Sequence, residues 1–186
     1  YYSYPKWFVE YCIKEFGTEE AENVLARGNR PPTLTYRHNP LKCSREELED
    51  IFNTHAVPFE HGELFDDFYV IKKQGLPLER ELIDTGYVYV QDQSAGIPVR
   101  ILNPQVGNHV LDLGAAPGGK STYAAMRMGN KGMITAVDLN QSRLETLVGN
   151  SQKLGTTIIA PVLCDILDFK GPKSSLRSEE RRVGKE

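Results

Sequence analysis

The stretch VLDLGAAPGGKS, from Val110 to Ser121, combines residue types that could hold a small-molecule ligand. An alternating apolar run leads into a glycine-rich turn, and a helix-forming segment follows. A glycine turn between a strand and a helix lets the backbone approach a ligand closely. We therefore expect the following residues to contact a cofactor: Gly114, Ala115, Ala116, Pro117, Gly118, Gly119 and Lys120.

The nature of this ligand is open to more than one interpretation. The segment from Gly114 to Ser121 also fits the G-x-x-x-x-G-K-[ST] spacing of a phosphate-binding P-loop. Two features count against phosphate, because Pro117 has no backbone N–H and Asp112 puts a carboxylate beside the turn. Both features suit a ligand with a cationic end, and S-adenosylmethionine carries an ammonium and a sulfonium group.

Two further carboxylates follow the next predicted strands. Asp138 ends the segment TAVD, 24 residues after Gly114, and is placed to accept hydrogen bonds from a ribose. Asp165 ends the segment VLCD and could accept from the exocyclic amine of an adenine. Each acid alone could simply cap the following helix. Together with the glycine turn they favour S-adenosylmethionine, and NAD fits less well because G-x-G-x-x-G is absent.

A longer segment resembles a known enzyme family. The sequence YVYVQDQSAGIPVRILNPQVGNHVLDLGAAPGGKST is similar to the entry of the catalytic domain in Nop/Sun RNA cytosine-5 methyltransferases, most of all their bacterial ribosomal-RNA branch. The upstream segments SYPKWFVEYCIKEFG, PPTLTYRHN and SREELEDIF resemble the part that precedes that domain. The resemblance extends from Ser3 to Phe169.

The resemblance implies a function and a set of ligands. It implies S-adenosylmethionine along Gly114–Lys120, with its ribose at Asp138 and its adenine at Asp165, and an RNA partner, ribosomal RNA in particular, for a full-length monomer. Gly114 stands where Sun-type loops commonly have cysteine, which leaves RNA ribose 2′-O-methyltransferases as one alternative. A P-loop nucleotide-binding protein is a second alternative, because of the spacing described above. Lys120 and the segment QDQSA favour the cytosine enzymes.

No catalytic residue is predicted within this chain. The resemblance implies two catalytic cysteines, one attacking cytosine C6 and one assisting release. In the family they lie in PC and TC motifs beyond the fourth and fifth strands, which this sequence is not expected to reach. The cysteines Cys12, Cys43 and Cys164 match neither motif, and Cys164 is expected as a buried residue within an apolar strand. Their odd number and scatter indicate free thiols in a reducing cytoplasm. The four histidines show no metal-ligand spacing, so no metal is expected, and neither is a membrane span.

The pattern of elements predicts an α/β fold. Residues 1–30 form a helical segment and residues 31–91 a small α+β module that is RNA-recognition-like, with strands in 33–39, 64–72 and 85–92. Residues 92–176 form the N-terminal part of a Rossmann-like methyltransferase domain. Its strands are expected at 109–113, 132–138 and 157–165 and its helices at 118–128 and 140–154, giving an incomplete parallel sheet of three strands.

Contact with RNA is expected from a local patch, because the net charge of −3 provides no general attraction for nucleic acid. Arg37 and Asn39, at the end of a predicted strand, are the candidate RNA-binding residues.

The last ten residues, RSEERRVGKE, resemble the translation of a sequencing-adapter oligonucleotide. We therefore expect residues 177–186 to be a processing scar, and the chain to be a C-terminally truncated, inactive fragment of a longer enzyme.

Overall fold

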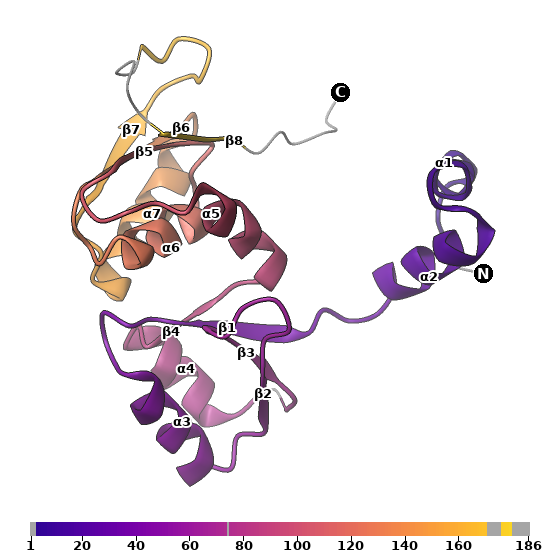
Figure 1. Ribbon diagram of the computed structural model, residues 1–186, viewed down its shortest axis with the longest axis horizontal. Helices are drawn as coiled ribbons and strands as arrows, with labels where there is room; N and C mark the ends of the chain where they lie inside the picture. The colour runs from indigo at the N-terminus through magenta and orange to yellow at the C-terminus, as the bar shows by residue number, and fades with distance from the viewer. Residues whose placement is uncertain (1–2, 74, 171–175, 180–186) are drawn as a thin grey trace. The chain divides into compact units, whose positions relative to one another are not determined.

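The computed structural model describes residues 3–73, 75–170 and 176–179, the last range by its backbone alone (Figure 1). The chain divides into two compact units, the first ending at Thr33 and the second beginning at Leu34.

The first unit is a pair of helices, α1 (Lys6–Phe16) and α2 (Thr18–Gly28). They pack through Cys12 on α1 and through Ala21 and Leu25 on α2. Gly17 joins them with a φ of +79°, a left-handed conformation that glycine adopts without strain. This turn lets the second helix start at once, so Thr18 is already helical and makes no capping hydrogen bond.

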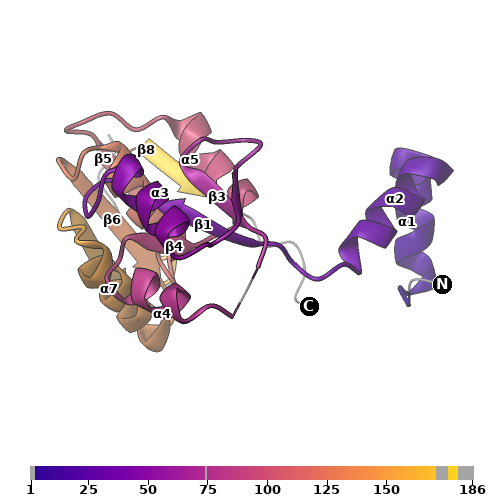
Figure 2. The same cartoon turned by 90° about the horizontal axis from the view of Figure 1, so that it is seen from below.

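The second unit begins with a four-stranded antiparallel sheet, β2-β3-β1-β4, labelled in Figure 1. Its elements follow the order β-α-β-β-α-β of ferredoxin-like domains: β1 (Leu34–His38), α3 (Arg45–Thr54), β2 (Phe59–His61), β3 (Phe68–Ile71), α4 (Pro77–Asp84) and β4 (Val88–Val90). Both helices cover one face of the sheet, where Leu48 and Phe52 of α3 and Leu82 of α4 pack in one core with Tyr36 and Tyr69 (Figures 1 and 2). The three-residue strand β2 was not expected, because so short a run shows no periodicity.

A parallel sheet follows, in the strand order β7-β6-β5-β8. Its elements, after the short helices η1 (Gln93–Gly96) and α5 (Ile97–Leu102), are β5 (His109–Leu113), α6 (Gly119–Arg127), β6 (Met133–Asp138), α7 (Gln141–Leu154), β7 (Ile159–Leu163) and β8 (Leu176–Glu179). Strand β6 pairs in parallel with both β5 and β7, so the predicted alternation of strands and helices is confirmed.

The fourth strand, β8, corrects the expected three-stranded sheet. It pairs in parallel with β5 from Leu176 to Glu179 and thus overlaps the segment set aside as a tail. Pairing of this kind uses backbone N–H and C=O groups, which an open sheet edge offers to any extended segment. A pattern of side chains therefore gives no signal for it.

The two sheets belong to one compact unit with a shared, partly polar core. Phe68 of β3 packs with Val99, Val110 and Tyr123 from the parallel-sheet domain. Beside them Asp67 accepts hydrogen bonds from Arg100 at 2.7 Å and from the Tyr123 hydroxyl at 2.8 Å. The ferredoxin-like domain is therefore positioned to contribute directly to a site on the parallel sheet.

Candidate functional site

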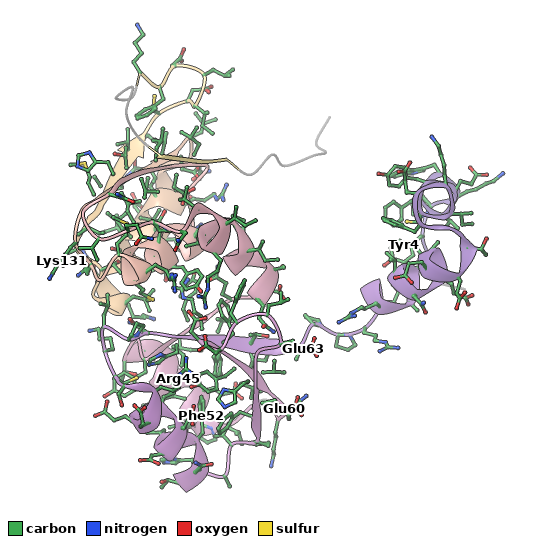
Figure 3. The ribbon with its side chains drawn as sticks, viewed as in Figure 1. Tyr4, Arg45, Phe52, Glu60, Glu63 and Lys131 are labelled. Carbon is green, nitrogen blue, oxygen red and sulfur yellow. The ribbon has the colours of Figure 1, made fainter. Side chains whose placement is uncertain are left out.

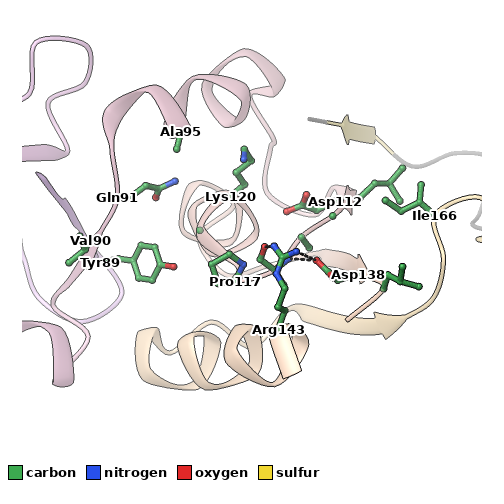
Figure 4. A pocket seen from close by; sticks show the side chains of 16 residues that line it. Tyr89, Val90, Gln91, Ala95, Asp112, Pro117, Lys120, Asp138, Arg143 and Ile166 are labelled. Atoms are coloured by element: carbon green, nitrogen blue, oxygen red, sulfur yellow. Dashed lines mark hydrogen bonds and ion pairs between the residues drawn. The ribbon is translucent and has the colours of Figure 1, made fainter. Parts of the chain in front are cut away.

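A cavity of about 530 Å³ opens at the carboxyl ends of β5 and β6, shown in Figure 4. Its size lies within the range of small-molecule sites, and this end of a parallel sheet is where such folds bind ligands. The lining residues are Tyr89, Val90, Gln91, Ala95, Asp112, Leu113, Gly114, Ala115, Ala116, Pro117, Gly119, Lys120, Asp138, Leu139, Arg143 and Ile166.

The glycine-rich loop is held by hydrogen bonds to the protein itself. The N–H groups of Gly114 and Ala115 donate to the Val137 carbonyl at 2.8 and 3.0 Å. The Gly118 N–H donates to the Ala115 carbonyl at 2.8 Å, and Pro117 has no N–H to offer. A P-loop needs consecutive amides directed at a phosphate, so this arrangement argues against that alternative.

Asp138 ties the loop to the end of β6. Its carboxylate accepts from the Ala116 N–H at 3.1 Å and from the Asn140 N–H at 3.1 Å, and it is almost fully buried. The Arg143 guanidinium lies 3.9 Å from the same carboxylate and also donates to the Ala116 carbonyl (Figure 4). Because an ionised carboxylate has about four acceptor positions, Asp138 can still accept from a ligand hydroxyl.

Gly118 serves the packing of the loop rather than the cavity wall. Its φ is +99°, and a Cβ there would lie 2.9 Å from Cγ of Leu147 on α7. Any side chain would therefore clash with a buried residue in addition to straining the backbone. Gly118 shapes the loop indirectly.

Most of the predicted cofactor residues meet at this cavity. Those on its wall are Gly114, Ala115, Ala116, Pro117, Gly119, Lys120 and Asp138. Asp165 lies beyond the end of β7 and is not part of the wall, although its neighbour Ile166 is. One Asp165 carboxylate oxygen accepts from the Leu167 N–H at 2.9 Å, so it is engaged in a local turn.

Sequence reasoning missed the wall contributed by the ferredoxin-like domain. Tyr89 and Val90 of β4, Gln91 and Ala95 all line the cavity. In the sequence the segment QDQSA carries a resemblance to the family and no signal of its place in the fold. Periodicity within one strand does not show that β4 ends beside a site on another sheet.

The prediction for Arg37 and Asn39 is corrected by their burial. Both side chains are fully buried, so they cannot meet RNA phosphates from the surface. Arg37 donates to the Gly119 carbonyl at 2.7 Å, and Asn39 donates to the carbonyls of Gly86 and Leu154 at 2.7 and 2.9 Å. A polar strand end looks the same in sequence whether it faces water or another domain.

The cysteines do not converge on the cavity. Cys12 and Cys43 are buried, and burial raises the pKa of the Cys43 thiol to about 11. Cys164 follows β7 instead of lying within it and is only half-buried, because the strand ends at Leu163. Within the described ranges, no cluster of His, Cys, Asp and Glu could hold a metal ion, and no helix is long and apolar enough to cross a membrane.

Two family descriptions match this chain in the order of its domains. Residues 4–75 match "Methyltr_RsmF/B-like, ferredoxin-like domain", and residues 99–176 match "16S rRNA methyltransferase RsmB/F". The chain belongs to the RsmB/F family of ribosomal RNA methyltransferases. This family depends on S-adenosylmethionine.

Individual relatives support the assignment. A Bacillus subtilis protein described as a probable ribosomal RNA small subunit methyltransferase B is 35% identical over 84% of this chain and 35% of its own length. The human 28S rRNA (cytosine(4447)-C(5))-methyltransferase is 32% identical over 84% of this chain and 20% of its own. The RsmB/F chain thus spans about a third or less of the length of these relatives.

A solved structure agrees with both the fold and the sequence. The methyltransferase homolog protein from Pyrococcus horikoshii superposes with a TM-score of 0.82 at 28% identity, covering 89% of this chain and 54% of that one. The fold of this chain, a ferredoxin-like domain followed by part of a Rossmann-like domain, therefore superposes on that solved structure over most of its length.

Proposed function

We propose that the protein to which this chain belongs transfers a methyl group from S-adenosylmethionine to C5 of cytosine in ribosomal RNA. One observation carries the proposal: the buried Asp138 carboxylate and the glycine-rich loop meet at one cavity, at the carboxyl ends of β5 and β6. The amides of this loop donate hydrogen bonds within the protein. The names of the relatives supply the substrate class. The loop amides that are already bonded within the protein disfavour a nucleotide phosphate as the ligand.

The residues of the cavity suit the parts of this cofactor. Asp138 has acceptor positions that would take the ribose hydroxyls, and the apolar side chains of Leu139 and Ile166 on the wall would pack against the adenine. Asp165 follows β7 near Ile166 and remains our candidate acceptor for the adenine amine. When bound, the cofactor supplies an electrophilic methyl group, and the protein holds and orients it.

The first test measures the affinity for S-adenosylmethionine by titration calorimetry. Asp138→Ala removes the ribose acceptor, and we expect binding to weaken by about 1–3 kcal/mol, as for the loss of a charge-assisted hydrogen bond. Asp138→Asn keeps one acceptor oxygen and should lose less. Asp50→Ala, which removes an exposed carboxylate from α3, is the control and should bind like the parent. Equal affinity in all variants would overturn the assignment of Asp138.

We also propose that this 186-residue chain alone does not methylate RNA. Covalent activation of cytosine needs a reactive thiolate. Cys43 stays protonated near neutral pH, Cys12 is buried in the helical pair, and Cys164 donates its thiol to the Asp165 carbonyl at 3.2 Å. The assay is methyl incorporation from labelled S-adenosylmethionine into unmodified ribosomal RNA, beside a full-length relative. Turnover by this chain would contradict the proposal, and turnover that survives Cys164→Ser would also show that the Cys164 thiol is not needed.

A further inference from the structure

A buried arginine stands directly behind one wall of the cavity. The Arg37 side chain comes from β1 of the ferredoxin-like domain, and its guanidinium lies 5.1 Å from the centre of the Tyr89 ring and 4.9 Å from that of Tyr123. It donates to the Gly119 carbonyl at 2.7 Å and to the Thr122 hydroxyl at 2.9 Å, both on α6. Burial lowers the pKa of Arg37 only to about 10, so it is a cation at neutral pH.

The remaining bond of this guanidinium determines the orientation of Gln91. Arg37 donates to the Gln91 side-chain oxygen. A guanidinium has only donors, so the amide of Gln91 must turn its oxygen to Arg37 and its NH₂ group the other way. This removes the ordinary ambiguity between the two ends of a glutamine side chain.

The NH₂ group of Gln91 lies over the start of α6. A Cβ built on Gly119 would be 3.4 Å from this nitrogen, and both residues line the cavity. In Figure 4 the amide nitrogen of Gln91 is directed toward the α6 side of the cavity, where Lys120 lies. Gln91 is more than nine-tenths buried as a residue and lines the cavity, so its NH₂ group can donate to a ligand that enters there.

The two ends of the cavity differ in chemistry. In Figure 4 Ile166 lies across the cavity from Gln91 and Lys120. Leu139 and Ile166 contribute apolar wall, while Gln91, Lys120 and the N-terminal end of α6 contribute donors and positive charge. If the apolar end takes the adenine and Asp138 the ribose, the amino-acid end of the cofactor reaches the donor end. Its carboxylate is the acceptor that this group of donors fits.

We propose that Gln91 binds the carboxylate of the cofactor's amino-acid moiety, and that Arg37 is a positioning residue that holds the Gln91 amide with its donors toward that carboxylate. This inference rests on the proposed function, since it assumes an S-adenosylmethionine site. It assigns a binding role to the ferredoxin-like domain, which supplies both residues.

The test compares two ligands that differ in that moiety. S-adenosylhomocysteine carries the carboxylate, whereas 5′-methylthioadenosine has the same nucleoside thioether without it. Gln91→Glu keeps the shape and strengthens the bond to Arg37 but replaces the donors by a negative oxygen. We expect calorimetry to show at least about a tenfold loss of affinity for S-adenosylhomocysteine, little change for 5′-methylthioadenosine, and an unchanged or higher melting temperature.

A matched pair of variants separates positioning from folding. Arg37→Lys keeps the charge, but a lysine cannot make all the hydrogen bonds of the Arg37 guanidinium at once. This variant should therefore lose the preference for S-adenosylhomocysteine over 5′-methylthioadenosine. Asn39→Ala removes another fully buried hydrogen bond, from the residue after β1 to the Leu154 carbonyl at the end of α7. Asn39 does not line the cavity. The substitution should lower stability and leave the preference intact.

The outcomes are distinct. If the parent chain binds neither ligand, the proposed function fails, and this inference fails with it. If the parent binds S-adenosylhomocysteine and Gln91→Glu binds it equally well, or loses both ligands alike, the proposed function stands and the role of Gln91 is refuted. An Arg37→Lys variant with the parent's preference would refute the positioning role.

Discussion

His38 is a buried imidazole at the end of β1, and its environment makes it sensitive to pH. Its Nε2 lies 2.9 Å from the Cys43 carbonyl, which a neutral ring satisfies by donating. Desolvation lowers the pKa of His38, opposed by the Cys43 carbonyl and by Asp67 and assisted by Arg45. The unfolded chain therefore binds a proton at a higher pH than the folded protein does.

The consequence is a loss of stability on the acid side. Above the ordinary histidine pKa both states are neutral and His38 has no effect. As the pH falls through that value toward the lowered pKa of the folded state, the free energy of unfolding should decrease by up to about 1.4 kcal/mol per pH unit. Urea unfolding of the parent and of His38→Gln, from about pH 7 to about pH 5, checks this. A variant with the parent's pH dependence would contradict it.

Helix α3 begins with a reciprocal pair of hydrogen bonds. The Ser44 hydroxyl accepts from the Glu47 N–H at 3.1 Å, and the Glu47 carboxylate accepts from the Ser44 N–H at 2.7 Å. This capping box satisfies two backbone N–H groups, those of Ser44 and Glu47, at the start of a helix whose Leu48 and Phe52 lie in the core of the ferredoxin-like domain. In the sequence Ser44 and Glu47 stand at the S-x-x-E spacing that is typical of such a box.

Removing the cap should destabilise this helix measurably. Ser44→Ala loses the acceptor for the Glu47 N–H, and we expect the free energy of unfolding to fall by about 1 kcal/mol. Ser44→Asp keeps an acceptor and should remain close to the parent. Chemical denaturation followed by circular dichroism provides the values, and an alanine variant as stable as the parent would show that the box contributes nothing.

Elements with a periodic pattern of apolar residues were predictable from the sequence. Elements that form by pairing with another segment were not. Apolar runs and glycine turns in the local sequence indicate the alternation of β5, α6, β6, α7 and β7. Strand β2 and the pairing of β8 depend on an available sheet edge. At the cavity, the glycine loop and Asp138 were predictable from a motif, whereas the Gln91 wall and the burial of Arg37 depend on how two domains meet.

The division of the molecule into two units predicts where a protease acts first. Residues 27–33, at the end of α2 and before β1, are all exposed, whereas β1 is buried in its sheet. Limited digestion with a protease of broad specificity should cut in this segment and release the helical pair. The remaining chain should keep its affinity for S-adenosylmethionine, because none of the cavity residues comes from the first unit. Early cleavage within 34–170, or loss of binding, would contradict this division.

The hydrogen bonds within the glycine loop also have a consequence for the speed of binding. Gly114, Ala115, Ala116 and Gly118 are held by acceptors of the protein itself, so an arriving ligand does not have to order the loop. Association is then governed by diffusion and by access to the cavity, and it needs no slow rearrangement before the ligand is seated. Differences in affinity among related ligands would lie in how long each one stays.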